Sequence, residues 1–182
     1  MKKLFAAAFF SLLSLTAMAE KADSLKQAAL EFDNSDADGV AGIRTFTGNV
    51  IVTRGTLLIK AERAVLRETP EGYMTVTLTA ANGKPATFRQ KRDGGPNLWV
   101  EGQAERIEYD ERSELVRLYS NAVVKELENT RMTNEITGPF ISYDNRKEIA
   151  TVRNDVSGES KVGGGRGTLI LAPKRAPAGG TQ

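Results

Sequence analysis

The sequence contains neither cysteine nor histidine in its 182 residues. Without cysteine there can be no disulfide, so burial and backbone pairing must hold the fold together. The two absences together exclude Cys/His zinc sites, Ser-His-Asp and Cys-His nucleophilic centres, and the usual general base at neutral pH. The composition therefore favours a protein that is not an enzyme and gives no reason to expect a metal or a cofactor.

The chain also lacks a strong excess of charge of either sign. It has 25 Lys and Arg against 23 Asp and Glu, a formal net charge of +2. Two of the basic residues, Lys2 and Lys3, belong to the N-terminal segment described next, so the remainder is neutral. A neutral chain does not point to nucleic acid as a partner.

The first 19 residues are typical of a secretory signal peptide. Lys2 and Lys3 form a basic start, residues 4–18 an apolar run, and Ala17-Met18-Ala19 an A-x-A cleavage site. The alternative is an uncleaved membrane anchor, but the run is shorter than the roughly 20 apolar residues of a spanning helix. We expect a secreted chain that begins at Glu20 and forms one domain over residues 20–172.

Residues 45–156 are typical of consecutive β-strands. Short runs of β-branched and aromatic residues alternate with polar ones and are broken about every ten residues by turn formers. Asn82-Gly83 predicts a tight hairpin turn, Gly138-Pro139 a bulge, residues 33–38 a turn-rich segment, and residues 173–182 a disordered tail. The predicted strands are 47–54, 56–66, 73–80, 86–90, 98–109, 114–119, 122–127, 134–143, 148–152, 155–157 and 168–171.

Alternation along these strands gives each one an apolar and a charged face. A stripe of apolar residues is usually packed interior, so a filled sandwich core is the simpler interpretation and an open groove the alternative. Two similar segments, 102–110 and 138–144, carry Tyr109 and Tyr143 at matching places and indicate repeated hairpin-like units. The two tyrosines could line a groove with their hydroxyls at its wet edge, or form ordinary cross-strand aromatic pairs.

Six carboxylates between residues 101 and 114 raise the possibility of glycosidase chemistry. Period two, however, places Glu108 and Asp110 on the face opposite Ile107 and Tyr109, among basic side chains. A solvated, charge-balanced face is the usual meaning of such a pattern. We predict no catalytic residue.

An ordered series of segments resembles the LptA, or organic-solvent-tolerance (OstA-like), family of lipopolysaccharide-transport bridge proteins. The series covers roughly residues 30–171 and is far more specific than one short motif. The segments that carry the resemblance are 45–55 (TFTGNVIVTRG), Ile59 with Ala61, 83–88 (GKPATF), 102–104 (GQA) with Tyr109, Leu118 with Asn121-Ala122, and Gly138 with Ile141 and Tyr143.

The resemblance implies an all-β fold, a single twisted, incompletely closed antiparallel β-jelly roll. It implies a periplasmic protein that holds the acyl chains of lipopolysaccharide in an apolar trough. Its partners would be an anchored inner-membrane protein at one edge and an outer-membrane assembly protein at the other, with head-to-tail homo-oligomers as a further possibility. The trough residues carried over by position are Val52, Ile59, Phe88, Tyr109, Leu118, Ile141 and Tyr143. The docking edges would be a first strand around Leu30 and Phe32, and a last strand with Thr168, Leu169 and Ile170.

Three other classes of protein remain as alternatives. A membrane-anchored component of the same pathway would need a retained anchor or a large barrel. A secreted structural β protein with a filled core would bind no lipid and would not depend on its terminal strands. An acid-base hydrolase would need two carboxylates facing a cavity, whereas the alternation points the obvious ones outward.

Overall fold

The computed structural model describes residues 23, 25–81, 83–95, 97–144, 147 and 149–173. The expected signal peptide, residues 1–19, and all of the expected tail except Pro173 lie outside the described residues. Among the described residues, no helix has the length and apolar character needed to cross a membrane.

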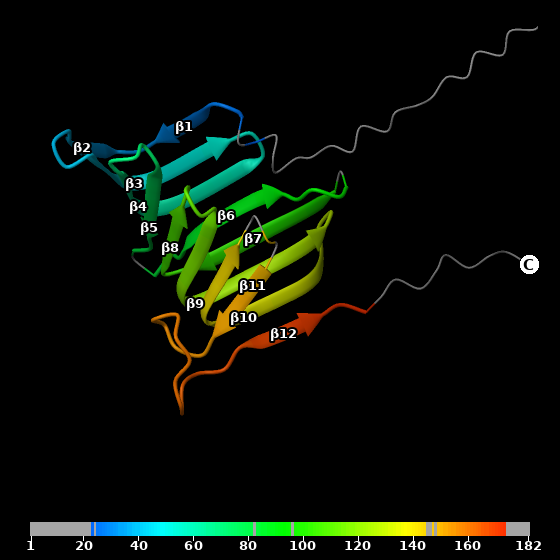
Figure 1. The fold of residues 1–182 in the computed structure, drawn as a ribbon. Helices are drawn as coiled ribbons and strands as arrows, with labels where there is room; N and C mark the ends of the chain where they lie inside the picture. The colour runs from blue at the N-terminus through cyan, green and yellow to red at the C-terminus, as the bar shows by residue number, and fades with distance from the viewer. Residues whose placement is uncertain are drawn as a thin grey trace, which may run out of the picture.

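Twelve strands form one antiparallel sheet (Figure 1), which confirms the all-β prediction. The sheet curls without closing: β1 and β2 lie at one end of it and β11 and β12 at the other, so the expected incompletely closed jelly roll is also confirmed. The strands are β1 (Ala28–Glu31), β2 (Asn34–Asp38), β3 (Ile43–Arg54), β4 (Leu57–Glu68), β5 (Met74–Thr79), β6 (Ala86–Lys91), β7 (Leu98–Ala104), β8 (Arg106–Asp110), β9 (Leu115–Glu128), β10 (Arg131–Asp144), β11 (Ile149–Arg153) and β12 (Thr168–Leu171).

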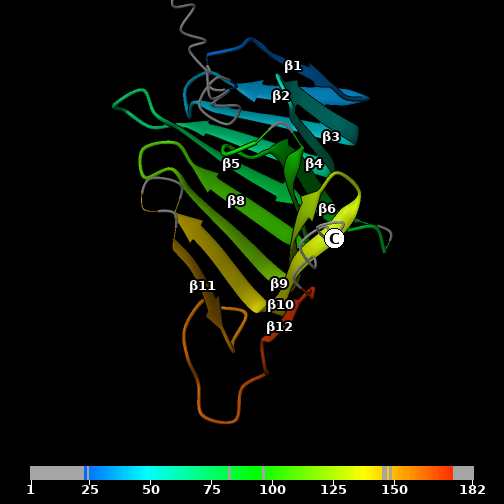
Figure 2. The same ribbon diagram turned by 90° about the vertical axis from the view of Figure 1, so that its right-hand side faces the viewer.

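Four long strands, β3, β4, β9 and β10, divide the sheet into two halves. One end of each long strand pairs within the series β2-β3-β4-β5-β8-β9-β10-β11, which we call the β5–β8 half. The other end pairs within β1-β3-β4-β6-β7-β9-β10-β12, which we call the β6–β7 half. The long strands thus run through a seam that joins the halves, and the view in Figure 2 separates β5, β8 and β11 from β6 and β12.

The seam coincides with irregular backbone. In β3 the register shifts between Thr47 and Val50, where Gly48 and Asn49 have φ of 80° and 47°. In β9, Ser120 and Asn121 have φ of 62° and 52°. The register between β9 and β10 shifts between Gly138 and Phe140, so an irregularity lies where the bulge was predicted, but the extra residue is on β9, where Ser120 and Asn121 face Pro139 alone. Bulges bend a strand and increase its twist, so these positions let one strand serve both halves.

Some predicted strand boundaries were wrong at the seam. The single strand expected over 98–109 divides at Glu105 into β7 and β8, because the two pieces pair with opposite ends of β9. Conversely, the strands expected at 114–119 and 122–127 are one strand, β9, which continues through its bulge. The hairpin expected at Asn82-Gly83 amounts to one bridge between Ala81 and Lys84, because β5 pairs with β4 and β8 whereas β6 pairs with β4 and β7.

Two further predictions failed for short segments. Residues 33–38 were expected to be turn-rich, yet Asn34–Asp38 forms β2, because the first half of β3 offers it an unpaired edge. Residues 155–157 were expected to be a strand but form a turn, in which Asp155 accepts hydrogen bonds from the backbone NH and hydroxyl of Ser157 at 2.9 and 2.6 Å. Local side-chain bonding of this kind competes with a strand ladder.

Candidate functional site: the interior and its two open edges

Rows of side chains cross the interior, two of them from one edge of the sheet to the other and a third from β4 to β11. In each row, every residue is the register partner of the next. The first row, in the β6–β7 half, is Leu30, Val52, Ile59, Phe88, Gly102, Val124, Ile136 and Leu169. The second, in the β5–β8 half, is Ser35, Phe46, Ala64, Leu78, Ile107, Leu118, Ile141 and Val152. The third, two residues further along the strands, is Leu66, Val76, Tyr109, Val116, Tyr143 and Ala150.

All seven predicted trough residues fall in these rows. Val52, Ile59 and Phe88 are consecutive in the first row, and Leu118 and Ile141 are adjacent in the second. Tyr109 and Tyr143 flank Val116 in the third row, so they are not partners of each other. The rows of both halves contribute to one hydrophobic cluster, which includes five of the seven residues: Val52, Ile59, Phe88, Leu118 and Ile141. Tyr109 and Tyr143 lie beside it, since both are register partners of Val116, which packs against it.

Burial divides the seven residues into two groups. Leu118 and Ile141 are each 1% exposed and belong to the packed centre beside the seam. The other five are only partly buried. Burial raises the pKa of Tyr109 above its usual value, and the nearby charges of Glu111 and Glu114 raise it further, so its hydroxyl stays protonated at neutral pH. The interior is thus filled at its centre and less crowded away from the seam.

Glycine at position 102 lets an aromatic ring approach the backbone of the sheet closely. The Phe88 ring covers Gly102, its register partner, so closely that a Cβ atom at position 102 would overlap the ring. This close approach of a side chain to backbone is a usual reason for glycine within a strand. The pair occupies the middle of the first row. The sequence analysis placed Phe88 in the trough but did not indicate that its ring covers Gly102.

An open cavity of about 410 Å³ lies where β11 and β12 diverge from β10, and we call it the edge cavity. Ile136 and Leu169 of the first row and Val152 of the second contribute its apolar wall. The remaining lining residues are Arg153, Asn154, Ser160, Gly167 and Thr168. The interior rows therefore end in an accessible hollow at the C-terminal edge.

The predicted docking residues lie at the two open edges. Leu30 belongs to β1, which pairs only with β3 among the described strands. Phe32 was expected in the same strand, but it lies in the break between β1 and β2, since the chain there crosses from one half of the sheet to the other. Thr168, Leu169 and Ile170 belong to β12, which pairs only with β10 and is exposed throughout.

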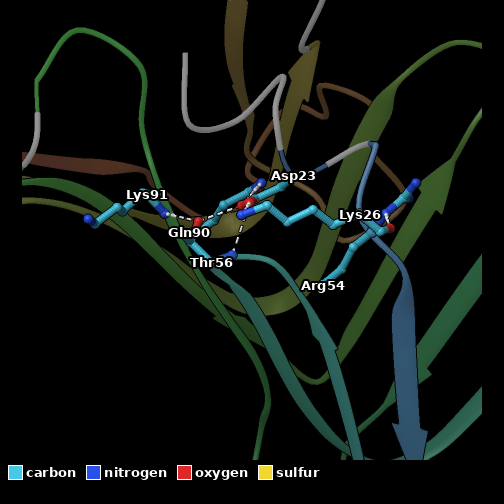
Figure 3. A network of polar contacts seen from close by, with 6 residues as sticks. All are labelled: Asp23, Lys26, Arg54, Thr56, Gln90 and Lys91. Atoms are coloured by element: carbon cyan, nitrogen blue, oxygen red, sulfur yellow. Dashed lines mark hydrogen bonds and ion pairs between the residues drawn. The ribbon is translucent and has the colours of Figure 1, made fainter. Parts of the chain in front are cut away.

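A buried carboxylate before β1 was missed by the sequence analysis. Asp23 is 2% exposed, and among the described residues it is the polar residue that is buried. Its Oδ1 accepts a hydrogen bond from the backbone NH of Thr56 at 3.0 Å, and its Oδ2 accepts one from the Thr56 hydroxyl (Figure 3). Gln90 Nε2 approaches the same Oδ2 at 3.4 Å, and Lys26 Nζ lies 3.8 Å from Oδ1.

These contacts fasten the chain before β1 to the end of the β6–β7 half. The Thr56 hydroxyl also accepts a hydrogen bond from the backbone NH of Lys91 at 3.2 Å, so the network joins the β3–β4 turn to the end of β6 (Figure 3). Burial alone would raise the pKa of Asp23, but the hydrogen bonds from Thr56 and Gln90 and the charge of Lys26 outweigh it and lower that pKa. Nothing in the local sequence signals this contact, which joins residues far apart in the chain.

Two of the carboxylates between residues 101 and 114 form ion pairs with arginines, and three others accept hydrogen bonds: Glu105, Asp110 and Glu111. Glu101 pairs with Arg89 at 2.7 Å, and Glu108 pairs with Arg106 at 3.4 Å and accepts a hydrogen bond from the Tyr119 hydroxyl at 2.9 Å. Glu108 is the strand neighbour of Ile107 and so points away from the interior rows. Within the described residues, no group of three or more His, Cys, Asp or Glu side chains could hold a metal ion.

Comparison with known proteins identifies the family. Residues 30–149 match the family model of the LptA/(LptD N-terminal domain) LPS transport proteins. The chain is 32% identical to the lipopolysaccharide export system protein LptA of Haemophilus influenzae, over 90% of this chain and 87% of that protein. It is 35% identical to LptA of Escherichia coli K12, over 68% of this chain and 65% of that protein.

A solved structure shares the fold. The crystal structure of LptH, the LptA homologous periplasmic component of the lipopolysaccharide transport device from Pseudomonas aeruginosa, superposes with a TM-score of 0.69. The match covers 83% of this chain and 99% of that one, at 22% sequence identity. Together with the sequence matches, this shows that the chain belongs to the LptA/LptD N-terminal domain family of lipopolysaccharide transport proteins.

Proposed function

We propose that this chain is a periplasmic carrier of lipopolysaccharide that bridges the inner and outer membranes and catalyses no reaction. The relatives it matches are named as lipopolysaccharide export proteins. The observation that carries the proposal is that the first and second interior rows run from the N-terminal to the C-terminal edge. Burying acyl chains against such a surface is favourable by about 0.8 kcal/mol for each methylene group.

The five partly buried trough residues are the proposed acyl-chain contacts. Val52, Ile59 and Phe88 would present one wall and Tyr109 and Tyr143 the other, with their apolar rings toward the ligand. Leu118 and Ile141 would form the floor between them, since they are fully packed without ligand. The proposal includes a secreted domain of residues 20–172 after cleavage behind Ala19.

The open edges are the proposed docking surfaces. Exposed edge strands are ready templates for strand addition. The N-terminal edge, β1 and β2, and the C-terminal edge, β11 and β12, would bind an anchored inner-membrane partner, an outer-membrane assembly partner or further copies of the chain. Such head-to-tail contacts generate open filaments rather than closed rings when no rotation closes them.

The test is photo-crosslinking in cells that make lipopolysaccharide. A photoreactive residue is placed at Phe88 or Tyr109, with Glu108, which faces outward beside Tyr109, as the matched control. We expect a lipopolysaccharide adduct at the two interior positions and none at position 108. Folded, well-expressed protein without an adduct at either interior position would contradict the proposal and favour a structural β protein with a filled core.

A further inference from the structure

We infer that the edge cavity is a socket for Phe32 of a second copy of this chain. The inference rests on the edge-to-edge association proposed above and adds to it the residue that enters and the site that receives it. Both edges are split in the same way: β1 and β2 are separated by a break at the N-terminal edge, and β11 and β12 diverge at the C-terminal edge (Figures 1 and 2). The edge cavity lies between β11 and β12.

The ring of Phe32 at the N-terminal edge packs against Phe46 on one side and is exposed on the other. Its ring centroid lies 4.7 Å from that of Phe46, a second-row residue that packs against the core. The Phe46 ring therefore holds Phe32 on the interior side of the sheet. Phe32 is nevertheless 40% exposed. A large apolar ring that is fixed on one side and open on the other is the type of group that anchors protein interfaces.

The edge cavity offers the complementary surface. Ile136, Val152 and Leu169 line it, and Leu169 is 57% exposed in this structure. Gly167 also lines the cavity, and a Cβ atom there would lie 2.8 Å from a methyl group of Val152. Glycine at position 167 therefore lets the backbone lie close to Val152 and leaves the cavity free of a further side chain.

Strand direction permits the two edges to join in both halves at once. Because every pairing in the sheet is antiparallel, β1 and β2 run opposite to β11 and β12. A second copy translated along the sheet therefore places its β1 antiparallel to β12 and its β2 antiparallel to β11. This arrangement continues each half of the sheet into the same half of the next copy.

The interior rows then bring the ring to the hollow. Leu30 of the second copy would extend the first row beyond Leu169, and Ser35 would extend the second row beyond Val152. In the chain, Phe32 lies between Leu30 and Ser35. At the other edge, the cavity lies between Leu169 and Val152, the residues that Leu30 and Ser35 of the second copy would meet. The ring of the second copy thus faces the cavity in the register that joins like rows.

Charge favours the same partner. Glu31 and Asp33 flank Phe32, and Asp36 follows in β2, whereas residues 27–43 contain no Lys or Arg. Arg153 lines the edge cavity and Arg166 precedes Gly167, and among the described residues neither forms an ion pair. Lys161 and Asp155 of the same edge pair with each other, and Glu159 lies between them in the chain. An acidic N-terminal edge that meets these two arginines guides association and disfavours pairing of two N-terminal edges.

The experiment places a benzophenone amino acid at position 32 in the full secreted chain. Unlabelled protein with this residue is mixed with ¹⁵N-labelled wild type, irradiated at high protein concentration, and the crosslinked peptides are mapped by mass spectrometry. Tyr73, which is 41% exposed and lies in the β4–β5 connection, is the matched aromatic control. We expect crosslinks between copies from position 32 to peptides containing Ile136, Val152 or Leu169, and none to these from position 73.

Sedimentation of the same samples distinguishes a failure of the Phe32 socket from a failure of self-association. Oligomers whose position-32 crosslinks map elsewhere, or that yield none, would overturn the socket while leaving edge association and lipid carriage standing. Monomers alone at high concentration would overturn the socket together with self-association, and the lipopolysaccharide adducts at positions 88 and 109 would still test carriage separately. As a second variant, Phe32→Ala should raise the dissociation constant between copies about tenfold or more, as for an interface anchor, whereas Tyr73→Ala should not change it.

Discussion

Gly102 leaves the space that the Phe88 ring occupies in the first row. Because the ring lies on the glycine backbone, an added methyl group would have to displace it. Overpacking of this kind usually costs about 1–3 kcal/mol. The glycine therefore determines how far the proposed trough residue Phe88 stands away from the strand.

We predict that Gly102→Ala lowers the free energy of unfolding by about 1–3 kcal/mol, measured by urea denaturation. Gly39→Ala is the control, since a Cβ atom there meets nothing within 4 Å. At that site the loss of chain freedom in the unfolded state should leave stability unchanged or raise it by about 0.4–1 kcal/mol. Equal effects at both positions would show that the Phe88 contact is not the cause.

Asp23 is the residue whose ionisation should couple most directly to the position of the N-terminal segment. Its pKa is lowered below 3.8 in the folded state, because the hydrogen bonds from Thr56 and Gln90 outweigh the effect of burial. A group with a lowered folded pKa stabilises the fold above its unfolded pKa, and this contribution is lost as pH falls through the folded value.

We predict that Asp23→Asn costs about 1–3 kcal/mol at neutral pH, because the amide cannot accept at both of its terminal atoms. The difference in unfolding free energy between wild type and this variant should be constant at neutral pH and should shrink as pH falls below about 4. Denaturation curves across that range measure it. A difference that grows toward low pH would contradict the assigned direction of the pKa shift.

At the scale of elements, the seam decides which strands are neighbours. β4 pairs through residues 58–60 with β6 and through residues 63–68 with β5, so the two strands that follow it in sequence go to opposite halves. Bulges and positive φ angles in β3 and β9 mark the same seam. A local turn signal such as Asn82-Gly83 carries no information about this division.

The positive φ of Ser120 in β9 allows backbone strain at the seam to be tested by substitution with glycine. An L-residue in the left-handed region is strained, whereas glycine is not. We predict that Ser120→Gly stabilises the fold by about 0.5 kcal/mol, because relief of this strain exceeds the entropy cost of glycine. Ser142→Gly, in the regularly paired part of β10, should instead destabilise it by about 0.5–1 kcal/mol. Guanidinium denaturation midpoints compare the two, and destabilisation by both would argue against strain at the seam.

The whole molecule combines a packed centre with rows that reach two open edges. A protein of this form leaves more apolar surface accessible after folding than a closed sandwich does. A ligand that covers this surface therefore adds to the stability of the folded state. A ligand that binds only the folded state stabilises it by about 2.7 kcal/mol at one hundred times its dissociation constant. The proposed carriage of lipopolysaccharide therefore has a thermodynamic consequence for the chain as a unit.

We predict that saturating lipopolysaccharide raises the melting temperature by about 5–10 °C, from that free energy and the usual response of a domain of this size. Differential scanning calorimetry measures the shift. Lipopolysaccharide stripped of its acyl chains should produce little of it, because the interior rows are apolar. An equal shift with the stripped ligand would place binding on the charged outer face.

The sequence by itself determined the all-β class, the face on which the seven interior residues lie and the family resemblance. Alternation with period two depends only on the pleat of a strand, so Val52, Ile59 and Phe88 could be assigned to one face without knowing their neighbours. Only the tertiary structure decided that β2 forms from a turn-rich segment, that β5 and β6 separate, that Asp23 is buried against Thr56, and that a cavity opens between β11 and β12. Each of these depends on contacts between distant parts of the chain, and local propensity does not encode which edge or partner the rest of the fold makes available.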